Sequence, residues 1–260
     1  MTSNPVDAKF RELVDESLRF YQRFKSEAVP HSVPILFFGD LDAYQETKGL
    51  KVVTVGLNPS NREFPSGSTF ERFPLMDGWE GEEPFDYAKY RESLCRYFHT
   101  CPCDWFDDYE SVLCGVGASY FPRASPNIAV HTDFCTPLAT AKVWSKLGDD
   151  TKDAFKEKGF PMWKDLIVYL KPDLVLASIG FNEHLRKLSP PVLWKIVFPN
   201  IAKPYKLRLV RKCFNGHPSV IVHGRQIHGQ PFAGLTDSEK ESVGKFIRKK
   251  YEQLTAKRRS

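Results

Sequence analysis

The sequence lacks the long apolar segments of membrane and secreted proteins. Its longest apolar runs, such as residues 174–179, are far shorter than the roughly 20 residues needed to span a bilayer. The first ten residues have neither an apolar core nor a small-residue cleavage site, so they do not read as a signal peptide. We therefore expect a soluble, intracellular protein with no membrane partner, cytoplasmic in a bacterium and nuclear in a eukaryote.

Several catalytic signatures are also missing. The chain has no Gly-rich phosphate loop and no Gly-x-Ser-x-Gly elbow, which argues against a nucleotide-binding protein or an ordinary α/β hydrolase. No carboxylate pair stands at helical spacing for standard glycosidase chemistry. Four cysteines, Cys95, Cys101, Cys103 and Cys114, lie close together but lack the paired C-x2-C spacing of structural zinc sites. Reduced thiols are favoured over a metal site, and we expect neither a metal nor a cofactor.

What is present suits one globular domain. The chain has 260 residues, of which 42% are hydrophobic and 13% aromatic, enough to build a core. No internal repeat and no linker divides it. We predict a single, monomeric domain over residues 1–260, with a helical N-terminal extension at about 1–30 and a basic C-terminal helix and tail at about 236–260.

The positive charge is concentrated in one part of the chain. Residues 184–260 carry 17 Lys and Arg against 4 Asp and Glu, whereas residues 1–183 carry 20 against 28. A basic C-terminal part on a mildly acidic body indicates a surface that faces a polyanion, although a solvated basic helix and tail is an equally open reading.

Four segments read as strands of a sheet. Residues 51–57, 127–132 and 173–180 are apolar and β-branched, as in buried parallel strands, and residues 205–214 alternate between apolar and charged side chains. Helical patterns separate them. The alternation predicts a three-layer α/β/α domain around a central, mainly parallel, four-stranded sheet.

Helices are marked by apolar spacing and by capping residues. A first helix with an apolar face runs from about Phe10 to Phe24, and Asn4 is the expected cap before Pro5. Residues 87–98, 105–113 and 163–170 are further helical segments, and another helix is expected to start near residues 181–183. Thr236 and Glu239 form a capping box for the last helix.

Polar loops follow three of the predicted strands. Gly56-Leu57-Asn58-Pro59-Ser60 follows the first, His131-Thr132-Asp133 ends the second, and His217-Pro218-Ser219 follows the fourth. Ligands of open parallel sheets gather beyond the carboxyl ends of the strands. We therefore expect an amide, an imidazole and backbone donors to converge in one cleft, although each fragment alone could be an ordinary turn.

The first and third of these loops resemble the two signature motifs of the uracil-DNA glycosylase superfamily. The first is similar to the Gly-x-Asn-Pro form of the mismatch-specific (thymine-DNA) and single-strand-selective branches. The resemblance extends over the sheet core, about residues 50–220, and implies a uracil-DNA glycosylase-like fold. It also implies a DNA glycosylase of base excision repair. No lysine stands at a motif position to form a Schiff base, so we expect a monofunctional enzyme without strand cleavage.

The resemblance assigns roles to individual residues. Asn58 would position the water that attacks the sugar, and His217 would stabilise the departing base. Gly56, Leu57, Pro59 and Ser219 would line the substrate site. Phe70 would stack on the flipped base, with Phe64 and Phe73 as competitors. Where the family has an Asn that reads the base edge, this chain offers His131, Thr132 or Asp133, so the identity of the base stays open.

The same resemblance indicates how DNA would be held. Val220 and Ile221 fall in the segment that wedges into the duplex, while Ser60, His223 and Arg225 would contact DNA. The expected function is therefore hydrolysis of the N-glycosidic bond of a flipped uracil or related damaged base in single- or double-stranded DNA. Two alternatives stay open: a glycosylase-fold protein that binds without cleavage or acts on another base, and an unrelated α/β hydrolase or nucleotide-binding protein.

Overall fold

The structure is a computed structural model that describes residues 7–64, 71–77, 79, 84–100, 102–179, 192–196, 205–227 and 229–256. The chain divides into two compact units, each built from three segments. Unit 1 comprises residues 1–42, 56–103 and 130–170, and unit 2 comprises residues 43–55, 104–129 and 171–260.

Unit 2 holds most of a central sheet, so the predicted α/β class is confirmed. The sheet has seven strands in the order β2-β3-β1-β4-β7-β6-β5. They are β1 (Lys51–Gly56), β2 (Ala118–Ser119), β3 (Asn127–Asp133), β4 (Leu174–Ala177), β5 (Val192–Ile196), β6 (Tyr205–Phe214) and β7 (His217–His223). Only Gly56 of β1 and residues 130–133 of β3 belong to unit 1.

All four predicted strands are present, but the prediction of a four-stranded sheet is wrong because β2, β5 and β7 join them. The pairs β2 with β3, β1 with β4 and β4 with β7 are parallel, whereas β6 is antiparallel to both β7 and β5. Asn215 and Gly216 join β6 to β7 with positive φ angles of 44° and 83°, the backbone that a tight two-residue hairpin needs.

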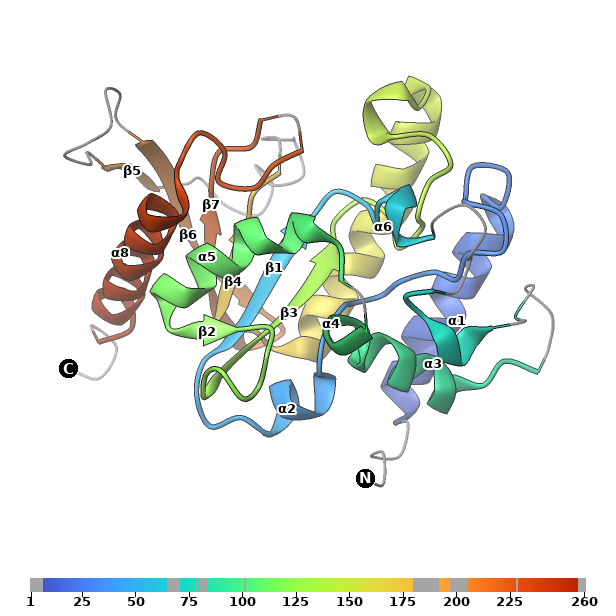
Figure 1. Ribbon diagram of the computed structural model, residues 1–260, viewed down its shortest axis with the longest axis horizontal. Coiled ribbons are helices and arrows are strands. Elements are labelled where there is room, and N and C mark those ends of the chain that lie inside the picture. Colours follow the sequence, from blue (N-terminus) through green and yellow to red (C-terminus); the bar gives the residue numbers. More distant parts are fainter. Residues whose placement is uncertain are drawn as a thin grey trace. The chain divides into compact units, whose positions relative to one another are not determined.

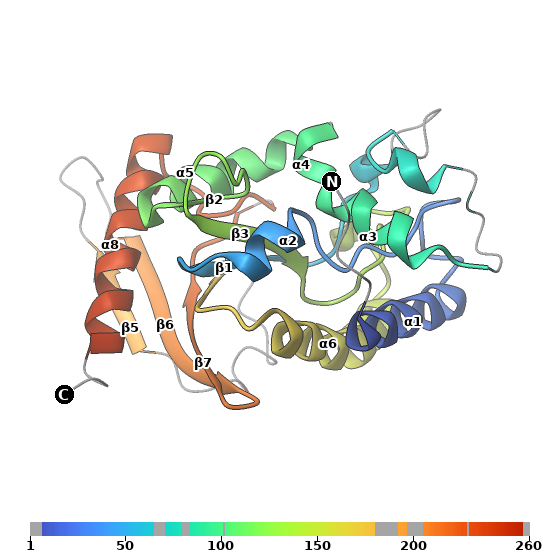
Figure 2. The ribbon, with the colours of Figure 1, turned by 90° about the horizontal axis from the view of Figure 1, so that it is seen from below.

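Two helices of unit 2 pack closely together, α5 (Asp107–Val116) and α8 (Asp237–Ala256), as Figures 1 and 2 show. Glycines make the close approach possible, because a Cβ on Gly115 or on Gly244 would overlap backbone atoms of the facing helix. The predicted capping box of α8 is confirmed: the Thr236 amide donates to Glu239 Oε2 at 2.8 Å, and the Glu239 amide donates to Thr236 Oγ1 at 3.4 Å.

Unit 1 is mainly helical. Its helices are α1 (Ala8–Arg23), α3 (Tyr87–Cys95), α4 (Tyr97–Thr100) and α6 (Asp149–Leu170), and α2 (Leu41–Glu46) begins in unit 1 and ends in unit 2. The described residues of unit 1 also form three single-turn 3-10 helices, η1 (Asn61–Glu63), η2 (Pro74–Met76) and η4 (Trp144–Lys146), and those of unit 2 form η3 (Asp104–Phe106).

The first helix departs from the prediction at its start. It begins at Ala8, and its cap is Asp7 rather than Asn4, because the Asp7 carboxylate accepts a hydrogen bond from the Phe10 amide at 2.7 Å. Asn4 and Pro5 lie outside the described residues, as does the helix expected near residues 181–183. Phe20 and Tyr21 of α1 pack with Phe155 and Met162 of α6 in one apolar cluster.

Candidate active site

Unit 1 brings together the ends of β1 and β3. The Phe134 amide donates to Gly56 O and the Cys135 amide donates to Leu57 O, both at 2.9 Å. These bonds hold Gly56 against two buried polar side chains of β3. A Cβ at position 56 would lie 2.5 Å from Asp133 Oδ1 and 3.0 Å from His131 Nε2. A residue with a Cβ at position 56 would overlap the Asp133 side chain, so the glycine of the first motif is required here.

Asp133 is the most unusual polar group of this region. Its side chain is 3% exposed, and its Oδ1 lies 3.7 Å from His131 Nε2. Its Oδ2 is buried and accepts no hydrogen bond from any described residue. Burial raises the pKa of the Asp133 carboxyl, and the interaction with His131 partly offsets that rise. A buried oxygen without a partner costs free energy, which is typical of a group that meets a ligand.

Asn58 follows β1 and is half-buried. Its Nδ2 donates to Thr140 Oγ1 at 3.1 Å and to Pro59 O at 2.8 Å. Because both bonds use the amide nitrogen, the side-chain oxygen is turned away from these partners and can accept a bond from water. Leu57 is half-buried and Pro59 buried. The hydroxyl of Ser60, predicted to contact DNA, instead accepts the Arg62 amide at 3.1 Å and caps η1.

A second buried carboxyl, Glu63, was missed by sequence reasoning. Its side chain is 3% exposed; Tyr97 Oη donates to Glu63 Oε2 at 2.6 Å, and Arg72 Nη1 lies 3.6 Å from the same oxygen. Burial raises the pKa of Glu63 to about 7. Tyr97 and Arg72 lower this pKa, and the charge of Asp133 raises it.

Aromatic rings pack around Glu63. Phe73 stacks between Phe64 and Tyr97, with ring centroids 5.4 and 5.7 Å apart. Phe64 and Phe73, the competitors for the base-stacking role, are both buried in this stack, so they serve packing. Phe70, the favoured stacking residue, lies outside the described residues.

Unit 2 supplies a second group of residues where β1, β4 and β7 approach their carboxyl ends. Val55 pairs with Ala177, and Ala177 pairs with His223, so one row crosses the three parallel strands. Tyr109 of α5 fixes the end of this row. Its Oη donates to Val55 O at 2.7 Å and accepts the Ser178 amide at 2.8 Å. Sequence reasoning also missed Tyr109 and Ser178.

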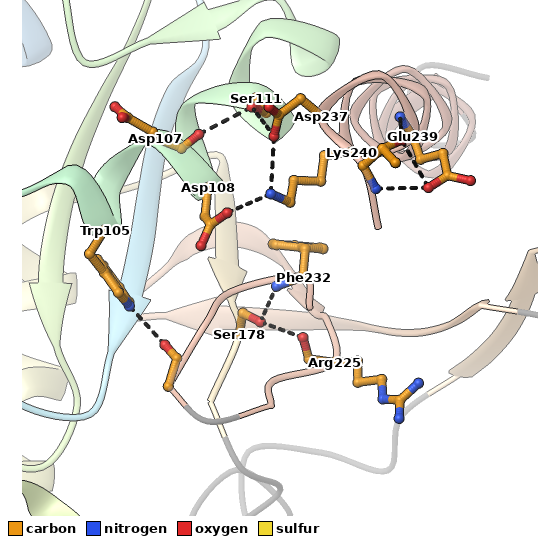
Figure 3. Close-up of polar contacts among 12 residues, drawn as sticks. Trp105, Asp107, Asp108, Ser111, Ser178, Arg225, Phe232, Asp237, Glu239 and Lys240 are labelled. Atoms are coloured by element: carbon orange, nitrogen blue, oxygen red, sulfur yellow. Dashed lines mark hydrogen bonds and ion pairs between the residues drawn. The ribbon is translucent and has the colours of Figure 1, made fainter. Parts of the chain in front are cut away.

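The loop that follows β7 is fastened to β4 by Ser178 (Figure 3). Ser178 Oγ donates to Arg225 O at 2.9 Å and accepts the Phe232 amide at 2.8 Å. Trp105 Nε1 donates a hydrogen bond to Gly229 O at 2.7 Å. Only the backbone of Arg225 takes part in this network; its side chain is exposed and points away from it (Figure 3).

His223 ends β7 and is half-buried. Burial lowers the pKa of His223 to about 4; the charge of Arg208 lowers this pKa further, and a hydrogen bond with the Ile179 backbone opposes the shift. A histidine with this pKa is neutral at pH 7, so it can donate one hydrogen bond without carrying a charge.

His217 does not lie where the sequence predicted. It begins β7, and its Nε2 lies 3.1 Å from Pro172 O, beside the amino end of β4. The prediction overlooked that β6 and β7 form an antiparallel hairpin. The carboxyl end of β6 therefore lies at the edge of the unit 2 sheet where β1, β4 and β7 begin, opposite to the edge where they end. Ser219 shares this misplacement, because its buried hydroxyl donates to Pro172 O at 2.6 Å.

The predicted wedge residues are also misplaced. Val220 and Ile221 are each 4% exposed and lie within β7, between β4 and β6. A side chain that enters a DNA duplex must be exposed, so their role as a wedge is wrong.

The described residues contain no group of three His, Cys, Asp or Glu side chains placed to hold a metal ion; Cys101 lies outside them. No described helix is both long and apolar enough to cross a membrane. Comparison of the sequence with models of known families and with curated proteins gives no match.

Proposed function

We propose that this chain is a monofunctional DNA glycosylase of the uracil-DNA glycosylase type, with the three-layer fold that this implies. The observation that carries the proposal is in unit 1. There, the Gly-x-Asn-Pro loop lies against Asp133, a buried carboxyl with one oxygen that no described residue satisfies. Such a group suits recognition of the polar edge of a nucleobase.

Asn58 orients the attacking water in this mechanism. An amide is too weak a base to deprotonate water, but its oxygen can hold one in place. Weak activation is sufficient if the base departs first as a stabilised anion and water then adds to the sugar. Most of the rate then comes from donors directed at the charge that develops on the base.

His223 takes the role that the resemblance gave to His217. His223 stands at the carboxyl end of β7, in the same row of the unit 2 sheet as Val55 of β1 and Ala177 of β4. For this role the single N–H of the neutral imidazole is directed at the base carbonyl oxygen, as that oxygen gains charge, rather than at the Ile179 backbone. The loss of one such donor raises a barrier by about 3 kcal/mol.

The protonation state of Asp133 determines which base the site recognises. When protonated, its carboxyl both donates and accepts, as an asparagine does, and it then suits uracil. When ionised it only accepts, and a base with more donors on its edge is favoured. A different altered base is therefore the second candidate substrate. The base must leave the helix to reach these groups, so the partner is single-stranded DNA or a duplex with a flipped nucleotide. The proposed chemistry assigns no role to a cofactor.

Base release from oligonucleotides tests the proposal. Single- and double-stranded substrates with uracil, a thymine mismatch, hypoxanthine or an oxidised pyrimidine are incubated with the protein, and abasic product is measured after alkaline cleavage. We expect release from at least one substrate, reduced about 100-fold or more by Asn58→Ala. Asn61→Ala, three residues further along, is the matched control and should retain activity. Release from no substrate, or equal release by Asn58→Ala, contradicts the proposal.

Asp133→Asn tests the part played by the carboxyl. An amide always offers both a donor and an acceptor, so this variant should favour uracil over the other bases more strongly than the native chain does. The ratio of single-turnover rates for two bases measures this effect. An unchanged ratio would show that Asp133 does not read the base.

A further inference from the structure

A long stretch of the chain contains no acidic residue. Residues 184–236 include nine Lys and Arg but neither Asp nor Glu. Strand β6 lies in this stretch and carries four of the nine cations. The sequence segments on both sides of β6 also lack carboxylates, so the positive charge of β6 has no acidic residue nearby in sequence.

The alternation of β6 sorts its side chains onto two faces. Tyr205, Leu207 and Leu209 are buried, whereas Lys206 is exposed and Arg208 is half-buried. Successive side chains of a strand point to opposite faces, so Lys206 and Arg208 share one face at a spacing of about 7 Å. One face of β6 is therefore part of the core, and the other presents cations.

Arg225 lies near the start of β6. The Arg225 amide donates to Tyr205 Oη at 3.1 Å, so the backbone of Arg225 lies beside the hydroxyl of a side chain on the buried face of β6. The Arg225 side chain is exposed and points away from the network that fixes its backbone (Figure 3). We call Lys206, Arg208 and Arg225 the cationic strip.

The cationic strip lies next to His223. Arg208 pairs directly with His223 across the β6–β7 ladder, and two residues separate His223 from Arg225. Within the described residues, Lys206 and Arg225 form no ion pair with a carboxylate. By contrast, Lys9, Lys89 and Lys158 of unit 1 are paired with Glu12, Asp86 and Glu157.

We propose that the cationic strip binds the phosphate backbone of DNA beside the nucleotide that is delivered to His223. This inference rests on the proposed function and names the surface that holds its substrate. Three cations, of which Lys206 and Arg225 are exposed and Arg208 is half-buried, match a partner with regularly repeated negative charge, and an arginine can bind a phosphate through two parallel hydrogen bonds. The strip thus supplies affinity without sequence preference, and His223 supplies chemistry.

The salt dependence of DNA binding tests the strip. Fluorescence anisotropy of a labelled 20-nucleotide duplex, and of the matching single strand, gives the binding constant between 50 and 300 mM NaCl. The strip variant is Lys206→Gln/Arg208→Gln/Arg225→Gln. Each lost phosphate contact lowers the slope of log K against log salt by about 0.9 on a duplex, so we expect a slope smaller by about 2.7. Binding at 100 mM salt should weaken at least about tenfold.

The control variant removes the same charge from unit 1: Lys9→Gln/Lys89→Gln/Lys158→Gln. Its slope should stay within about 0.5 of the native value, because these lysines are already paired with carboxylates. The double variant Lys206→Gln/Arg225→Gln spares the half-buried Arg208, and its slope should fall by about 1.8. Slopes that are equal for the strip and control variants would overturn the proposal, as would a strip variant that loses binding to an RNA of the same sequence but not to DNA.

Base release separates this inference from the proposed function. If both hold, the double variant Lys206→Gln/Arg225→Gln, which keeps Arg208 beside His223, needs more DNA than the native chain to reach its maximal single-turnover rate. If no base is released from any substrate, the proposed function fails, while the slopes still report whether the strip binds DNA. A strip variant with native binding and native DNA dependence overturns the strip alone.

Discussion

Strand β7 carries one histidine at each end, and the two have different surroundings. His217 lies at the amino end, with Nε2 near the Pro172 carbonyl. His223 lies at the carboxyl end, where burial lowers its pKa to about 4 and where Ser178 and Tyr109 fasten the neighbouring backbone. Ligand sites of parallel strands form where the strands end, not where they begin, so the proposed catalytic role falls to His223.

The contrast shows that a motif needs a strand direction as well as a sequence. His217-Pro218-Ser219 follows a strand, as the family motif does, but the preceding strand β6 runs antiparallel to β7 and β4. Reversing that one strand moves its loop to the opposite edge of the unit 2 sheet. Four further measurements test whether the two ends differ in function as well as in surroundings.

The largest effect is expected from removing each histidine in turn. His223→Ala should lower the single-turnover rate of base release by about 10²- to 10³-fold, because one donor to the developing charge is lost. His217→Ala should change the rate less than threefold. Circular dichroism and thermal melting establish that both variants are folded. A larger loss in His217→Ala than in His223→Ala would reverse the assignment.

The next largest effect is expected in the pH dependence of stability, to which His223 contributes and His217 serves as the control. The pKa of His223 is lowered in the fold, so its contribution to stability is present above pH 6.5 and is lost as the pH falls to about 4, by about 3 kcal/mol. The pKa of Glu63 is raised, so its contribution is present below pH 4.5 and is lost as the pH rises through 7, by a similar amount.

These two contributions oppose each other between pH 4.5 and 6.5. Urea unfolding of His223→Gln should therefore show stability that falls with rising pH in this range, and Glu63→Gln should show stability that rises. His217→Gln is the control and should follow the native profile. Parallel profiles for His223→Gln and Glu63→Gln would contradict the account.

Two glycines, one in the β6–β7 turn and one at the end of β1, should have different effects on stability and activity. Gly216→Ala, in the β6–β7 turn, meets no atom within 4 Å but must adopt a φ near +83°, so it should cost about 1–2 kcal/mol of unfolding free energy and leave base release unchanged. Gly56→Ala should instead displace Asp133 and reduce base release at least tenfold. Equal activity of the two variants would show that Gly56 is not part of the site.

The smallest effect concerns the far end of the loop that follows β7. Thr236→Ala removes the hydroxyl that accepts the Glu239 amide, and the unfolding free energy should fall by about 1 kcal/mol. The exposed Ser242→Ala within α8 is the control, and its effect should be smaller. Thermal unfolding of both variants measures the difference.

Local patterns predicted much of the fold. Buried β-branched runs located β1, β3 and β4, alternation located β6, and a capping box located the start of α8. Asn215-Gly216 is itself a strong hairpin signal and could have revealed β7, but the likeness of the following His-Pro-Ser to a motif favoured a loop there instead.

The sequence could not predict the partners of buried side chains. Glu63 and Tyr97 are separated by 34 residues, and nothing in either segment indicates their hydrogen bond. The same holds for Tyr109, which joins β1 to β4 from a helix. Of the candidate site, sequence alone provided Gly56, Asn58 and Asp133, whereas the choice between two histidines required the strand order.

The most direct measurement of the central claim is an NMR titration of the histidine rings with DNA that contains 2′-fluorodeoxyuridine, whose fluorine slows loss of the base. Assignments come from the His217→Gln and His223→Gln variants. The account predicts that the His223 ring signals shift on binding and that the His217 signals stay in place. Shifts at His217 with none at His223 would contradict it.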